Sequence, residues 1–227
     1  MNVESALIQA ISINPGYLRA KRILDIVFTV FVLLPLCIVI AIVAILIRLD
    51  SKGPIFYRQR RVGWKGVVFD MFKIRTMYED SDDSIHRFAA EKYIKGEVLN
   101  YNSAADDLSY KLSDQCDTRI TRVGRFIRKT SIDELPQFFN VLRGEMTLVG
   151  PRPPLPYEVE LYTPRDWLRL SGKPGLTGAW QVYGRSRVPF QTMVEMDIEY
   201  LQHQSLLQDL KLITLTIPVM IQGRGGV

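Results

Sequence analysis

The segment RKTSIDELPQFFNVLRGEMTLVGPRPP, residues 128–154, places two adjacent carboxylates between groups of cations. Asp133 and Glu134 follow Arg128 and Lys129 at the opening of a predicted helix. The helix N-terminus and the nearby cations favour the ionised form of Asp133, which leaves it available as a nucleophile or a metal ligand. Carboxylates among arginines therefore indicate phosphate chemistry.

The same residues also fit an ordinary helix cap. Ser131 and Glu134 have the spacing of a capping box, in which the two side chains satisfy free backbone N–H groups of the first turn. Such a box accounts for Glu134 but not for Asp133. Pro136 confines the helix start to this neighbourhood, because proline is tolerated only near a first turn, and either Ser131 or Asp133 fits as the N-cap.

At the other end of the segment, Gly150-Pro-Arg-Pro-Pro154 fits neither a regular helix nor a central strand, because three prolines fix φ and remove hydrogen-bond donors. A stiff, extended backbone would hold the Arg152 guanidinium in place as a phosphate clamp. The alternative is a surface turn with a solvated arginine. The combination of Asp-Glu with Gly-Pro-Arg-Pro favours the clamp.

A membrane-inserted helix is predicted near the N-terminus. Residues 26–47 form a run of 22 residues without a formal charge, about 33 Å as a helix and enough to cross a bilayer core of about 30 Å. Pro35 divides the run into two arms, each roughly one leaflet deep, and basic residues on both sides favour the cytoplasm for both ends. These flanking residues are Arg19, Lys21, Arg22, Arg48, Lys52, Arg58, Arg60 and Arg61. A re-entrant helix is therefore expected, with a spanning helix as the alternative. Asp25, at the edge of the run, is expected to pair with Arg22 at the interface.

The remainder, residues 51–227, is expected to form a small α/β catalytic domain following the membrane segment at 1–50. Ile55–Arg60 and Val67–Ile74 predict a hairpin, and the next residues carry Lys73 and Arg75 toward the presumed site. Residues 79–117 hold ten acidic and four basic residues, which indicates a solvated polar insertion with a short helix at 84–95, and the rest of the chain has a net charge of +11.

Amphipathic helices are predicted on either side of the central segment. Arg122, Arg125 and Lys129 share one helical face, which suits anionic headgroups; with no nucleic-acid motif beside them, we expect no nucleic-acid partner. An amphipathic helix is expected at 157–170, and an interfacial amphipathic helix at 205–221. A helix between these two carries Glu195, Asp197 and Glu199, which are expected to be solvated. The chain has only two cysteines, Cys37 within the apolar run and Cys116 in a polar segment, so no disulfide is expected.

Three segments carry a resemblance to a known family: KTSIDELPQFFNVLRGEMTLVGPRP (129–153), KPGLTGAWQVYGRS (173–186) and SKGPIFYRQRRVG (51–63). They resemble the bacterial sugar transferases, the monotopic phosphoglycosyl transferases, over nearly the whole chain. The resemblance implies a re-entrant membrane helix, commonly with Ser-Pro at its break. Leu34-Pro35 stands here instead, so the serine that would bond to the broken backbone is missing.

The resemblance also implies the chemistry. A sugar 1-phosphate, most simply a hexose phosphate, would pass from a UDP-sugar to polyprenol (undecaprenyl) phosphate with release of UMP, as the first membrane step of bacterial polysaccharide assembly. Asp133 would be the nucleophile, Glu134 would assist it, and both would hold Mg²⁺. By the same likeness Arg128, Arg152 and Arg185 contact phosphate.

Other readings of the residues stay open at this point. A nonenzymatic membrane-surface adaptor would use the basic faces for lipid and the Asp-Glu pair only as a cap. A membrane-anchored phosphohydrolase would use the same carboxylates without a lipid acceptor. The apolar C-terminal helix serves a homodimer as readily as it serves contact with membrane lipids.

Overall fold

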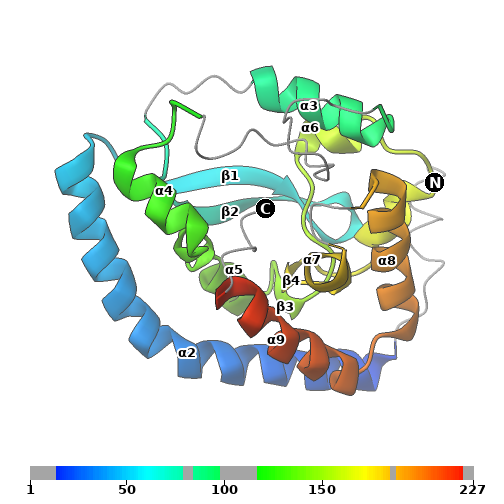
Figure 1. Ribbon diagram of the computed structural model, residues 1–227. Helices are drawn as coiled ribbons and strands as arrows, with labels where there is room; N and C mark the ends of the chain where they lie inside the picture. The colour runs from blue at the N-terminus through cyan, green and yellow to red at the C-terminus, as the bar shows by residue number, and fades with distance from the viewer. Residues whose placement is uncertain (1–13, 79–83, 98–116, 185–187, 222–227) are drawn as a thin grey trace.

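The longest element of the chain is helix α2 (Pro15–Asp50), found in a computed structural model that describes residues 14–78, 84–97, 117–184 and 188–221. The Asn14 side chain caps its start by accepting a hydrogen bond from the Gly16 amide. Pro35 lies within the helix and does not end it. Figure 1 shows α2 bent into two arms that follow two sides of the molecule. The predicted break is thus a bend, as expected where a proline removes one hydrogen bond from a helix interior.

The outer surface of α2 is apolar. Phe31 and Leu34, beside the bend, are 83% and 77% exposed, although burial would be expected of such side chains in water. Further exposed apolar side chains continue along both arms: Ile23, Val27, Val30, Ile38, Ile42, Ile45 and Leu49. By length and composition α2 is able to cross a membrane. The described part of the chain is therefore a mixed α/β structure with one long apolar helix suited to membrane insertion.

Both ends of α2 are attached to the folded part that follows it. Near the start, the Lys21 ammonium lies 2.7 Å from the Asp209 carboxylate, and both side chains are buried. At the end, the Asp50 carboxylate accepts a hydrogen bond from the Val123 amide at 3.0 Å.

The predicted interfacial ion pair between Asp25 and Arg22 was wrong, because Asp25 is buried and binds a strand. Its carboxylate accepts hydrogen bonds from the Leu148 amide (3.0 Å) and the Thr147 hydroxyl (2.7 Å), both in strand β3 (Thr147–Val149). Arg22 instead donates to the carbonyl oxygens of Val141 and Leu142. Buried acceptors and donors are satisfied in this way by partners distant in sequence, which local spacing does not reveal.

Two small sheets lie on the inner side of the bent helix α2 (Figure 1). Strands β1 (Phe56–Val62) and β2 (Val68–Ile74) pair antiparallel around a 3₁₀ turn, η1 (Trp64–Gly66), which confirms the predicted hairpin. Strand β3 pairs parallel with β4 (Gly175–Thr177).

Short helices surround the sheets. Helix α3 (Ser84–Ile94) matches its prediction, and α4 (Arg122–Lys129) begins at a Thr121 cap. The predicted helix at 157–170 is instead two short pieces, α6 (Pro156–Val159) and η3 (Asp166–Ser171). Pro164 lies between them and explains the interruption, because proline disfavours helical geometry at the residue before it. The other helices are α5 (Gln137–Arg143), α7 (Ala179–Tyr183), α8 (Phe190–His203) and α9 (Leu206–Ile221).

Helices α8 and α9 hold buried charges as well as apolar side chains. Asp197, predicted to be solvated, is buried on α8 against Arg169, whereas Glu195 and Glu199 are exposed as expected. On α9, Asp209 points inward, and Leu207, Leu210 and Ile217 remain exposed.

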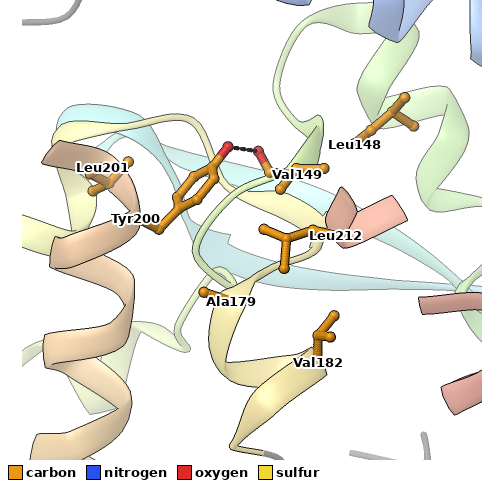
Figure 2. Packing of buried hydrophobic residues seen from close by; sticks show 7 residues of the cluster. All are labelled: Leu148, Val149, Ala179, Val182, Tyr200, Leu201 and Leu212. Atoms are coloured by element: carbon orange, nitrogen blue, oxygen red, sulfur yellow. Dashed lines mark hydrogen bonds between the residues drawn. The ribbon is translucent and has the colours of Figure 1, made fainter. Parts of the chain in front are cut away.

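A core cluster joins β3 to the last three helices (Figure 2). Leu148 and Val149 of β3 pack with residues of α7, α8 and α9, and the Tyr200 hydroxyl lies 3.1 Å from the Val149 carbonyl oxygen. The other members are Ala179, Val182, Leu201 and Leu212. This core fixes the end of β3, from which the chain enters the proline-rich segment.

Replacing Asp25 by alanine tests how α2 is attached to β3. We expect Asp25→Ala to lower the free energy of unfolding by about 1–3 kcal/mol, because the buried Leu148 amide loses its acceptor. Thermal unfolding in detergent measures the change, with Glu199→Ala, at an exposed position of α8, as the control. Equal melting temperatures for the two variants would contradict this role of Asp25.

Candidate active site

Asp133 and Glu134 lie on a single 3₁₀ turn, η2 (Ile132–Glu134), between α4 and α5. The predicted capping box does not form. Ser131 is in the left-handed region (φ 56°) and its side chain caps nothing, while α5 begins after Pro136 without a side-chain cap. The capping alternative therefore does not hold, and Glu134 is bound instead by side chains from other elements.

The conformation of Ser131 is costly for a residue with a Cβ. Left-handed geometry costs a non-glycine residue about 1–2 kcal/mol. The turn is held by three backbone hydrogen bonds, from the Ser131 amide to the Arg128 carbonyl, from the Glu134 amide to the Ser131 carbonyl and from the Leu135 amide to the Ile132 carbonyl. Strain of this kind, retained next to two carboxylates, is typical of functional sites.

Glu134 is bound by two cations from different parts of the chain. Its Oε1 lies 3.0 Å from Nη2 of Arg152 and 3.5 Å from Nζ of Lys73. Lys73 comes from β2, which packs against η2, and thus reaches the site as predicted. Arg75 does not, since its guanidinium donates to the backbone carbonyl oxygens of Ser51 and Lys52 beside the end of α2.

The Asp133 carboxyl is less acidic than the sequence suggested. Burial raises its pKa to about 6, and the neighbouring Glu134 charge adds to the rise. The charges of Lys73, Arg128 and Arg152 oppose this effect, with Lys73 the strongest. Asp133 is therefore mostly ionised at pH 7, as predicted, but because cations offset its burial.

The predicted site residues that the structure describes converge on one place. Asp133, Glu134 and Arg152 are in the site, and Arg128, on the last turn of α4, is close enough for its charge to lower the pKa of Asp133. Arg185 lies outside the described residues. Three cations surround two carboxylates, and this positive surplus suits a doubly or triply charged phosphate compound.

The donor set also fits the implied Mg²⁺. The described residues contain no group of three or more histidine, cysteine, aspartate or glutamate side chains that would enclose a metal ion. Mg²⁺ does not need one, because it is commonly held by one or two carboxylates together with substrate phosphates and water. Asp133 and Glu134 would supply those carboxylates.

Two buried arginines beside the site were missed by the sequence reasoning. Arg61 donates to the Pro153 carbonyl oxygen at 2.8 Å, and Arg169 lies near the Arg152 carbonyl oxygen. Arg61 had been counted only as a charge flanking the membrane run, and Arg169 fell within the predicted amphipathic helix. No local pattern distinguishes either from a surface arginine.

Titration of Asp133 tests this electrostatic description. In metal-free protein we expect its carboxyl to titrate near pH 6, and Lys73→Met to move the titration to higher pH, because the strongest cation favouring the carboxylate is lost. Carbon-13 NMR of aspartate-labelled protein measures both, with Asp133→Asn to assign the resonance. A titration near pH 4 in both proteins would show that burial does not govern this group.

Comparison with known proteins identifies the family of this chain. A model of the bacterial sugar transferase family matches residues 16–223. The chain therefore belongs to the bacterial sugar transferases.

Three curated relatives illustrate its range. The chain is 44% identical over 213 residues to the galactosyl transferase CpsE of Streptococcus agalactiae, covering 93% of this chain and 44% of that protein. It is 39% identical over 210 residues to the exopolysaccharide production protein ExoY of Sinorhizobium fredii, covering 91% of this chain and 88% of that protein. It is 38% identical over 206 residues to the undecaprenyl-phosphate galactose phosphotransferase of Salmonella typhimurium, covering 91% of this chain and 41% of that protein. The chain thus spans less than half of two of these relatives and most of the third.

Proposed function

We propose that this protein transfers a hexose 1-phosphate from a UDP-hexose to undecaprenyl phosphate and releases UMP. The observation that carries the proposal is the pair of carboxylates on the strained turn η2, enclosed by Lys73, Arg128 and Arg152. Membership of the sugar transferase family, with relatives named as undecaprenyl-phosphate galactose and glucose phosphotransferases, supports this substrate class.

The proposed reaction has two displacements at phosphorus. An oxygen of the Asp133 carboxylate attacks the sugar-bearing phosphorus of the donor, the bond to the bridging oxygen breaks, and UMP leaves with that electron pair. An oxygen of undecaprenyl phosphate then attacks the same phosphorus and displaces Asp133 as a free carboxylate. The cations are required because each attack brings an anion to an anionic phosphate.

Each residue near the carboxylates has a distinct part in this proposal. Lys73 keeps Asp133 ionised, and Arg152 and Arg128 bind phosphate oxygens of the donor; Arg185 is proposed to do the same. Glu134 holds Arg152 in the absence of donor and accepts the proton of the lipid phosphate. Mg²⁺, when bound by Asp133 and Glu134, would neutralise part of the diphosphate charge.

The attachment of both ends of α2 to one folded part supports a re-entrant helix, and the basic residues on both sides of the uncharged run support a site on the cytoplasmic face of the inner membrane. Lys21 and Asp50 lie on opposite sides of the bend and contact the same folded part. A spanning helix would have to break one of these contacts. The membrane-bound arrangement would place Asp133 near the headgroup plane, where the phosphate of a lipid acceptor resides.

Intact-mass analysis tests the covalent step. Wild-type protein incubated with Mg²⁺ and a panel of UDP-sugars, without lipid, is expected to gain the mass of one hexose phosphate and to release one UMP. Asp133→Asn is expected to show no adduct at an unchanged melting temperature, because an amide is not a competent nucleophile.

Other results would favour the other functions. UMP formed only when undecaprenyl phosphate is present, with no adduct, would favour direct transfer. Phosphate release without a lipid acceptor would favour a phosphohydrolase. No turnover with any donor, together with a fully functional Asp133→Asn protein in the cell, would favour the adaptor.

Cysteine labelling tests the membrane arrangement. In a Cys37→Ser, Cys116→Ser background, Arg19→Cys and Lys52→Cys are expected to react with an impermeant maleimide in inverted vesicles and not in intact cells. Gln202→Cys, at an exposed position of α8, is the control for the cytoplasmic side. Opposite labelling of the two helix ends would establish a spanning helix.

A further inference from the structure

Residues 151–154, the proline segment, are held through every one of their backbone carbonyls. Three of the four residues are prolines and offer no N–H, so carbonyls are the main backbone groups by which the segment is fixed. Pro151 accepts a hydrogen bond from the Gly175 amide and Pro154 from the Val62 amide, both at 2.9 Å. The two carbonyls between them accept from side chains.

Those two side chains are arginines that come from different elements. Nη1 of Arg61, on β1, donates to the Pro153 carbonyl at 2.8 Å. Nη2 of Arg169, on η3, donates to the Arg152 carbonyl at 3.3 Å. Arg152 is thus held through its own backbone carbonyl, by Arg169, and through the carbonyl of the next residue, Pro153, by Arg61.

Both arginines are fixed in turn and mostly buried. Arg61, 8% exposed, also donates to Oε1 of Gln59 from Nε (3.2 Å) and Nη2 (2.8 Å). Arg169, 3% exposed, donates to Oδ2 of Asp197 from Nε (3.1 Å) and Nη2 (2.7 Å), and Nη1 donates to the Tyr162 hydroxyl at 2.8 Å. A planar fork with several fixed partners loses little further freedom on binding a carbonyl.

Close backbone packing supports the start of the segment. A Cβ on Gly175 would collide with the backbone of Gly150. The two backbone segments approach this closely only because both positions are glycine. The backbone of the proline segment is therefore fixed at both ends, and from it the Arg152 side chain extends to Glu134.

We propose that Arg61 and the Arg169–Asp197 pair are positioning residues for Arg152. They act on the reaction through the backbone of the proline segment, and their effect rests on the proposed function of Arg152 as a phosphate ligand. A shift of about 1 Å in a group that orients a substrate can lower a rate about 100-fold, which sets the scale of the effect. Neither arginine needs to contact the substrate for this role.

A double-mutant cycle tests the proposal for Arg61. Arg61→Met is expected to lower kcat/KM for UMP formation by about 10- to 100-fold, on the scale of a small misplacement. In an Arg152→Met background the same change is expected to cost less than about twofold, because the side chain to be positioned is already absent. Losses that multiply in full would show that Arg61 acts independently of Arg152 and would overturn the proposal.

The Arg169–Asp197 pair needs a variant that preserves the fold. Arg169→Met alone leaves a buried carboxyl without its cation, which can unfold the protein. The double variant Arg169→Met, Asp197→Leu replaces the pair by apolar side chains, and we expect it to stay folded but to lose activity as Arg61→Met does. Arg165→Met is the matched control, because Arg165 pairs with Glu195 across η3 and α8 in the same way but is exposed. A fully active, folded double variant would contradict the role of the pair.

Hydrogen exchange separates this proposal from the proposed function. The amides of Val62 and Gly175 donate to the two ends of the proline segment, and we expect both to exchange faster in Arg61→Met than in wild type and unchanged in Arg165→Met. Unchanged exchange would refute the holding of the segment by Arg61, whatever the activity. If these amides exchange faster in Arg61→Met but the wild-type protein forms no UMP, the proposed function is refuted and the holding of the segment by Arg61 is not.

Discussion

The buried ion pair between Lys21 and Asp209 connects the apolar helix to the part of the chain that shapes the site. The Lys21 ammonium also donates to the Tyr200 hydroxyl at 3.1 Å, and this hydroxyl lies 3.1 Å from the Val149 carbonyl at the end of β3. The next residues are Gly150 and the proline segment with Arg152. Because removing one partner from a buried ion pair leaves a charge uncompensated, the placement of α2 and the geometry around Arg152 depend on the same few contacts.

The elements that the sequence predicted well are those defined by neighbours along the chain. Alternating branched and aromatic residues around Gly63–Gly66 specify the β1–β2 hairpin, and the uncharged run around Pro35 specifies α2 and its bend. The adjacency of Asp133 and Glu134, and the proline-locked Arg152, indicated three side chains that the structure brings together, whereas their roles came from the family resemblance. In each case the relevant physics is local: backbone sterics, periodicity and charge at short separation.

The errors concern side chains whose partners are distant in sequence. Glu134 has the spacing of a helix cap but binds Arg152 and Lys73, and Asp197 has the spacing of a solvated residue but meets Arg169. Both carboxylates make charge-assisted hydrogen bonds to arginines from other elements rather than to a backbone amide in their own turn. Which guanidinium is available is decided by the packing of η3, α8 and β1, and one sequence carries no direct record of that packing.

In the proposed re-entrant arrangement, the two attachments of α2 have a mechanical consequence for the lipid around the protein. A helix fastened at both ends to one folded unit cannot slide along its axis or change its tilt freely, so the depth of the exposed apolar bend relative to Asp133 is set by the protein. Hydrophobic mismatch would then have to be absorbed by the bilayer, through local thinning or thickening. The lipid would conform to the protein, so a membrane of different thickness would change the strain in the leaflet while leaving the height of the carboxylates above it the same.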